Sequence, residues 1–101
     1  MSVNQYETMT EALARLRERG FTAGFQPVAD GLRDPESGKT FRAEDLRLVE
    51  FHRFEGATDP DDMAVVYAFE TRNDARGVVV DAYGPYADPA LGEVLRRVHP
   101  V

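Results

Sequence analysis

The sequence predicts an α+β fold with two layers: an antiparallel sheet of about four to five strands, and an N-terminal and a C-terminal helix packed on one face. Helical periodicity is confined to the two ends of the chain, apolar and β-branched runs fill the middle, and the connections between these runs are short. Short connections favour antiparallel neighbours, because a parallel pair needs a crossover of about a dozen residues. Helices that do not alternate with strands argue against a doubly wound fold. The length of 101 residues predicts a single domain spanning residues 1–101.

The first helix is predicted over Met9–Arg19. Thr8 and Glu11 have the spacing of a capping box, in which a hydroxyl and a carboxylate each satisfy an amide of the first turn. Apolar residues then recur at intervals of three and four, which gives one apolar face. Gly20 suits the position after the helix end, where a left-handed backbone is common.

A hairpin and a loop follow this helix. The apolar segment Phe25–Ala29 predicts a strand, and Asp30-Gly31 is a strong signal for a two-residue turn. Pro27 confines that strand to a sheet edge, since proline cannot donate to a ladder. The composition of Asp34–Lys39 predicts a loop, and Ala43–Asp45 predicts a single helical turn.

The middle of the chain predicts three longer strands, over Leu46–Phe54, Met63–Thr71 and Gly77–Ala82. A second helix begins at Pro89, because proline is favoured at the first helical position and Asp88 can cap it. The order of elements is therefore helix, strands, helix.

Composition limits the classes of function. The net charge of −6 argues against nucleic acid, since phosphate binding depends on clustered Lys and Arg. The chain has no cysteine, which excludes disulfides and thiolate chemistry. It has no long apolar run, and its N-terminus lacks the basic start and apolar stretch of a signal peptide. We therefore expect a cytoplasmic protein with no cofactor and no membrane partner.

The strand over Leu46–Phe54 carries the first candidate site. Strict alternation places Glu50 and His52 on the open face of the sheet, with Val49 and Phe51 facing the helices. Glu50 and His52 could then form an acid–base pair, because histidine titrates near neutrality. The alternative is a solvated face with an ion pair between strands.

Carboxylates gather immediately after that strand. Glu55 and Asp59, with Asp81 from the strand predicted over Gly77–Ala82, could hold a hard cation through oxygen ligands. The spacing around Asp59 does not match an EF-hand loop. The alternative is a hydrophilic turn built around Pro60.

A tyrosine-rich loop lies between the valine strand and the last helix. Tyr83 and Tyr86 could line a pocket, since their rings are apolar and their tips polar. They could equally close the end of the core. The predicted surface for a ligand or partner combines the arginine and aromatic residues of this region with nearby acids: Arg53, Glu55, Asp81, Tyr83 and Tyr86.

Two segments, F-H-R-F-E-G-A-T-D-P-D-D and V-V-V-D-A-Y-G-P-Y-A-D, resemble a family of small bacterial proteins of about this length. The resemblance covers nearly the whole chain and implies the same order of helix, strands and helix. Members often carry the label phosphoribosylpyrophosphate synthetase, which would imply a sugar-phosphate substrate.

The residues of the second segment can be compared with a phosphoribosyl-pyrophosphate loop. Such a loop resembles an apolar strand followed by two adjacent acids and a Thr/Gly turn that cradles the 5-phosphate. Val78–Asp81 matches the strand and the first acid, whereas Ala82 stands in place of the second acid. Pro85-Tyr86-Ala87 stands in place of the phosphate turn, and Asp88 puts a carboxylate where the phosphate would lie. The motif therefore argues against synthetase chemistry.

These observations lead to two expectations about function. The first is a small non-catalytic module that binds a protein or a small-molecule ligand. Self-association as a homodimer fits this architecture, since a sheet covered on one face leaves its other face or an edge open. The second is an enzyme that uses metal or acid–base chemistry on a phosphorylated or sugar-phosphate substrate, with His52 and Glu50 converging on Asp81 and the neighbouring acids.

Overall fold

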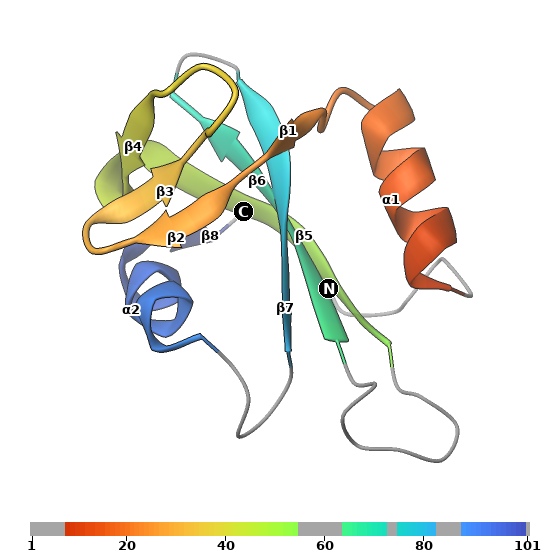
Figure 1. Ribbon diagram of the computed structural model, residues 1–101. Helices are drawn as coiled ribbons and strands as arrows, with labels where there is room; N and C mark the ends of the chain where they lie inside the picture. The colour runs from red at the N-terminus through yellow and green to blue at the C-terminus, as the bar shows by residue number, and fades with distance from the viewer. Residues whose placement is uncertain (1–7, 55–63, 73–74, 83–87, 101) are drawn as a thin grey trace.

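The computed structural model describes residues 8–54, 64–72, 75–82 and 88–100. Two helices and eight strands form within these ranges, together with one 3-10 turn, η1 (Figure 1). In chain order they are α1 Met9–Glu18, β1 Ala23–Gly24, β2 Gln26–Val28, β3 Gly31–Arg33, β4 Thr40–Arg42, η1 Ala43–Asp45, β5 Leu46–Phe54, β6 Ala64–Thr71, β7 Arg76–Ala82, α2 Pro89–Arg97 and β8 His99–Pro100.

The larger sheet is mixed, with the strand order β1-β7-β6-β5-β8. Its three long strands are antiparallel neighbours, as predicted. The two outer strands are parallel to theirs: β1 to β7 and β8 to β5. The prediction of a purely antiparallel sheet is therefore wrong. Both outer strands have only two residues, too few for a periodic signal, and a long stretch of chain separates each from its partner, which permits parallel pairing.

A smaller sheet, β2-β3-β4, is a separate antiparallel unit. Val28 pairs with Gly31, so the two-residue turn is Ala29-Asp30, one position before the predicted one. Pro27 lies in β2 at the edge of this sheet. A Cβ on Gly31 would lie 1.9 Å from the Phe41 carbonyl oxygen, so this position needs glycine for the close approach of β4.

Both helices have the predicted caps. The Thr8 Oγ1 atom accepts a hydrogen bond from the Glu11 amide at 3.1 Å, and the Asp88 carboxylate accepts one from the Ala90 amide at 2.8 Å. At the end of α1, Gly20 has a φ of 100°, and the Phe21 amide donates back to the Leu16 carbonyl. Neither helix in the described part of the chain is long and apolar enough to cross a membrane.

Two hydrophobic clusters lie on opposite faces of the larger sheet. Leu16 and Phe21 pack with Val66 and Ala68, whereas Phe69 belongs to a second cluster that includes residues of α2. Successive residues of a strand point to opposite faces. The α1 helix and the α2 helix therefore cover different faces, as Figure 1 shows. The prediction that both helices pack on one face is not confirmed.

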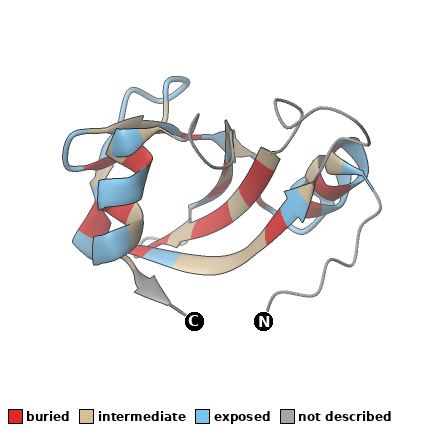
Figure 2. Ribbon diagram, turned by 90° about the horizontal axis from the view of Figure 1, so that it is seen from below, coloured by how far each residue is buried: buried red, intermediate tan, exposed pale blue. Residues whose placement is uncertain are grey.

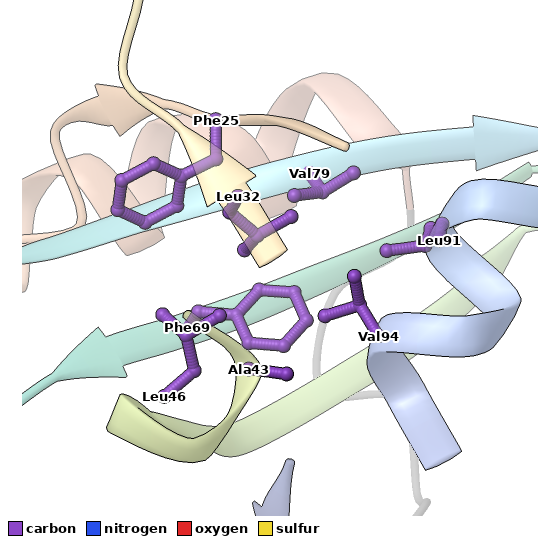
Figure 3. Packing of buried hydrophobic residues seen from close by; sticks show 8 residues of the cluster. All are labelled: Phe25, Leu32, Ala43, Leu46, Phe69, Val79, Leu91 and Val94. Carbon is purple, nitrogen blue, oxygen red and sulfur yellow. The ribbon is translucent and has the colours of Figure 1, made fainter. Parts of the chain in front are cut away.

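The second cluster is the larger core and joins the two sheets. Phe69 is fully buried between residues of η1, α2 and the smaller sheet (Figure 3). Figure 2 shows buried positions on the sides of both helices that face the sheet. Among the residues that the structure describes, the buried members of this cluster are Phe25, Leu32, Ala43, Leu46, Phe69, Val79, Leu91 and Val94.

Candidate functional site

The structure brings Glu50 and His52 together on β5. The His52 Nε2 atom lies 2.6 Å from the Glu50 Oε2 atom. His52 is only 4% exposed, however, so the expectation that it stands on a solvated face is wrong. It lies opposite Val66 on the sheet, within reach of the α1 cluster.

A β-bulge explains this difference. Leu48 pairs with Phe69 and Glu50 pairs with Ala68, so Val49 is an extra residue on β5. An extra residue reverses the alternation of every later side chain. In the first half of β5, the side chains of even-numbered residues therefore point to the side of the sheet that α2 covers. In the second half, Glu50 and His52 point to the side that α1 covers.

Arg19, the residue that ends α1, completes a cluster with Glu50 and His52. Its Nη2 atom lies 2.6 Å from the Glu50 Oε1 atom. The hydrogen bond from Arg19 lowers the pKa of Glu50 below its ordinary value of 4.5; partial burial opposes this shift, and the hydrogen bond from His52 adds to it. Glu50 is therefore a carboxylate at neutral pH. An ionised carboxylate only accepts hydrogen bonds, so the His52 Nε2 atom carries the hydrogen.

This arrangement limits what Glu50 can do chemically. A general base works best when its pKa lies near the operating pH, and the pKa of Glu50 is shifted away from it. Each of its two oxygens already accepts a hydrogen bond, one from Arg19 and one from His52. The Arg19–Glu50–His52 cluster thus connects the end of α1 to β5.

A second group of charges continues the cluster along the end of α1. Glu70 pairs with Arg76 at 3.0 Å and with Arg47 at 3.7 Å. The Arg76 Nη1 atom also donates to the Arg19 carbonyl at the helix end, where a cation is favourable. The guanidinium groups of Arg19 and Arg76 lie 5.6 and 5.5 Å from the centre of the Phe21 ring.

The predicted binding residues separate into two groups. Arg53 and Asp81 lie on either side of Val65 across the sheet. Both Asp81 carboxylate oxygens accept from the Asp88 amide, at 3.2 and 3.1 Å, so this side chain helps to begin α2. The remaining predicted residues lie outside the described ranges: Glu55, Asp59, Tyr83 and Tyr86.

Asp81 does not converge with the histidine. Asp81 pairs with Val65 and His52 pairs with Val66, which are neighbours on β6 and point to opposite faces. The two parts of the predicted enzyme site therefore lie on opposite sides of the sheet. Within the described ranges, no group of three or more His, Asp or Glu side chains has the arrangement of a metal site.

A groove that the sequence did not predict lies between α1 and the β1–β7 edge of the larger sheet. It has a volume of about 410 Å³ and extends from Leu13 and Phe21 to Val80. Val80 is 47% exposed and is the large apolar residue with the most open side chain among those described. Sequence signals for this groove were weak, because its walls come from a helix and two strands that are distant in the chain.

A second hollow, of about 300 Å³, lies where η1 meets the end of β6. Each of the three carboxylates that line it pairs with an arginine: Asp45 with Arg72 at 3.4 Å, Glu70 with Arg47, and Glu44 with Arg97 of α2. These carboxylates are therefore already engaged by cations within the protein.

Comparisons of the chain with protein-family models, with curated proteins and with solved structures find no match. The family resemblance of the two sequence segments remains an expectation.

Proposed function

We propose that this protein is a small non-catalytic module that binds another polypeptide. The observation that carries the proposal is the apolar groove between α1 and the β1–β7 edge, with Val80 exposed inside it. Apolar surface rimmed by polar residues is typical of interaction sites. We place the protein in the cytoplasm, as the composition suggests.

The state of Glu50 supports a role without catalysis. Among the described residues, His52 and Glu50 form the only histidine–carboxylate pair, and Arg19 holds the Glu50 carboxylate in the charged form. The hydrogen bonds of Glu50 therefore connect parts of the fold and do not prepare it for proton transfer.

A selection from random linear peptides of about ten residues, displayed on phage, tests the proposal directly. Immobilised protein should enrich peptides that bind in solution with micromolar dissociation constants. Absence of enrichment over protein unfolded by urea would contradict a polypeptide-binding role.

The enzyme alternative makes a different prediction. A sugar phosphate or nucleotide with Mg²⁺ at about a hundred times its dissociation constant should stabilise the fold by about 2.7 kcal/mol. A thermal-shift panel of these compounds measures this directly. We expect no shift, and a shift abolished by His52→Gln would support the enzyme instead.

The polypeptide that this protein binds could be a second copy of the same chain, which would make a homodimer. Light scattering at micromolar concentration distinguishes the two forms, because a mass near 11.3 kDa is that of a single chain. A monomeric mass would remove the homodimer and leave a different polypeptide as the partner.

A further inference from the structure

The β7 strand has an edge that β1 covers only in part. The Phe25 amide donates to the Val78 carbonyl at 2.9 Å, so the backbone polar groups of Val78 face β1. Because these groups alternate along a strand, the N–H and C=O of Val80 face the same edge. The described pairing of β1 with β7 ends at Val78. Figure 1 shows β7 continuing beyond β1.

The groove beside this edge has apolar walls at the spacing a strand requires. Val78 and Val80 are two residues apart, so their side chains lie on one face of β7. Leu13 and Phe21 form the facing wall. An extended segment laid along β7 would place alternate side chains against these four residues.

Arg17 supplies a positive charge in the groove. Among the described residues that line the groove, Arg17 is the only charged one. Most of the eleven arginines in the chain pair with a carboxylate, but Arg17 and Arg33 have no carboxylate partner among the described residues. An open guanidinium beside a strand edge is suited to a carboxylate, which arginine binds in a fork.

We infer that the groove binds an extended acidic segment of a partner protein, which adds as a strand to the β7 edge at Val80 and places a carboxylate on Arg17. This inference rests on the proposed function and names the partner class. Backbone hydrogen bonds give such a complex its affinity, and the pockets for alternate side chains give its specificity.

The charge of the protein favours a different partner over a second copy. Each chain carries a net charge of −6, so two copies repel one another. A short acidic segment carries fewer negative charges than a second copy, so this repulsion is smaller, and its carboxylate meets the local positive charge of Arg17. A second copy is nevertheless a distinct outcome of the experiment.

Peptides enriched by the selection provide the probe. We expect alternating apolar residues with at least one Glu or Asp, and no proline in the alternating stretch. Fluorescence anisotropy then compares three variants of the full chain. Val80→Pro removes the backbone N–H that faces the open edge of β7, and it leaves the hydrogen bonds between β7 and β6 in place. This variant should bind the peptide about tenfold more weakly or worse.

Arg17→Ala should weaken binding by about threefold at low ionic strength, and the difference should shrink as salt screens the pair. Arg33→Ala is the matched control, since Arg33 lies in β3 and likewise has no carboxylate partner within the described ranges, and this variant should bind like the wild type. If Val80→Pro fails to fold by circular dichroism, Val80→Lys replaces it, since an edge lysine blocks strand addition.

The outcomes separate this inference from the proposed function. Enriched peptides that bind all variants equally would overturn the groove assignment and leave the binding function standing. Peptides with helical rather than alternating apolar spacing would also overturn it. A concentration-dependent dimer that Val80→Pro dissolves would identify a second copy as the occupant. If nothing is enriched, both proposals fail.

Discussion

At the scale of single residues, Glu50 is the side chain with the largest consequence. It lies on β5, takes hydrogen bonds from Arg19 and His52, and has a side chain only 18% exposed. If the Glu50 carboxylate is removed, Arg19 and His52 lose a hydrogen-bond acceptor, which costs more free energy than the hydrogen bonds themselves contribute. Because the folded structure also lowers the pKa of Glu50, the stability of the fold depends on pH.

Replacement Glu50→Gln should lower the free energy of unfolding by about 1–3 kcal/mol near neutral pH. The folded pKa of Glu50 lies below its ordinary value of 4.5, so its contribution is complete above that value and is lost as the pH falls through the folded pKa. The difference between variant and wild type should thus shrink in acid. Urea unfolding at about pH 7 and about pH 3 measures both quantities.

The control for this prediction is Glu93→Gln. Glu93 is exposed and pairs with Arg96 one turn away on α2. Its replacement should change the free energy of unfolding by less than about 0.5 kcal/mol. A Glu50→Gln penalty that stays the same from neutral to acid pH would show that the charge of Glu50 does not carry the effect.

At the scale of elements, the sequence predicts most where a pattern is local. The β5 strand has its predicted bounds, Leu46–Phe54, and both helices begin at their predicted caps, Thr8 and Asp88. Local signals suffice here, because capping and strand composition act within a few residues. The two-residue strands β1 and β8 were not predicted, since pairing with distant partners forms them.

In the candidate site too, the sequence predicts contacts between neighbouring residues and misses those between distant ones. The sequence places Glu50 and His52 two residues apart, and the structure brings their side chains into contact. It does not indicate Arg19, which is 31 residues away from Glu50 in the chain. The bulge at Val49 was also hidden, because it depends on how β5 pairs with β6.

A substitution in α2 tests the element scale. Gly92 is exposed inside the helix, and a Cβ there would have no atom within 4 Å. Gly92→Ala should therefore raise the free energy of unfolding by about 0.5–1 kcal/mol, since glycine loses more backbone entropy than alanine on folding. Thermal unfolding followed by circular dichroism measures the change.

Gly31→Ala provides the contrast. Its Cβ would meet the Phe41 carbonyl oxygen at 1.9 Å, so this substitution must force β3 and β4 apart and lower the melting temperature. Equal effects of the two substitutions would mean that the close approach of these strands does not control stability.

At the scale of the whole molecule, β6 holds two cores together. Val66 and Ala68 face the α1 cluster, and Phe69 faces the cluster that contains α2 and the smaller sheet. Because these residues follow one another on a single strand, loss of packing on one face disturbs the strand that supports the other. We expect the two clusters to unfold together.

Phe69→Ala tests this coupling. Phe69 is fully buried, so its truncation should lower the free energy of unfolding by about 3–5 kcal/mol. Near-ultraviolet circular dichroism, far-ultraviolet circular dichroism and calorimetry should still report one coincident transition. Val66→Ala, on the opposite face, should shift the same transition by a smaller amount. Separate transitions in either variant would show that the two faces fold independently.

The spacing of Glu50 and His52 also restricts where this protein can change in length. A deletion of Phe51 would make Glu50 and His52 adjacent, and adjacent residues of a strand point to opposite faces, so one of the two would turn away from Arg19 toward the apolar face covered by α2. Insertion of one residue between them would have the same effect. Substitutions can accumulate gradually along β5, but the interval between these two residues is fixed by the contacts they share. Gains and losses of residues in this chain should therefore concentrate away from that part of the strand.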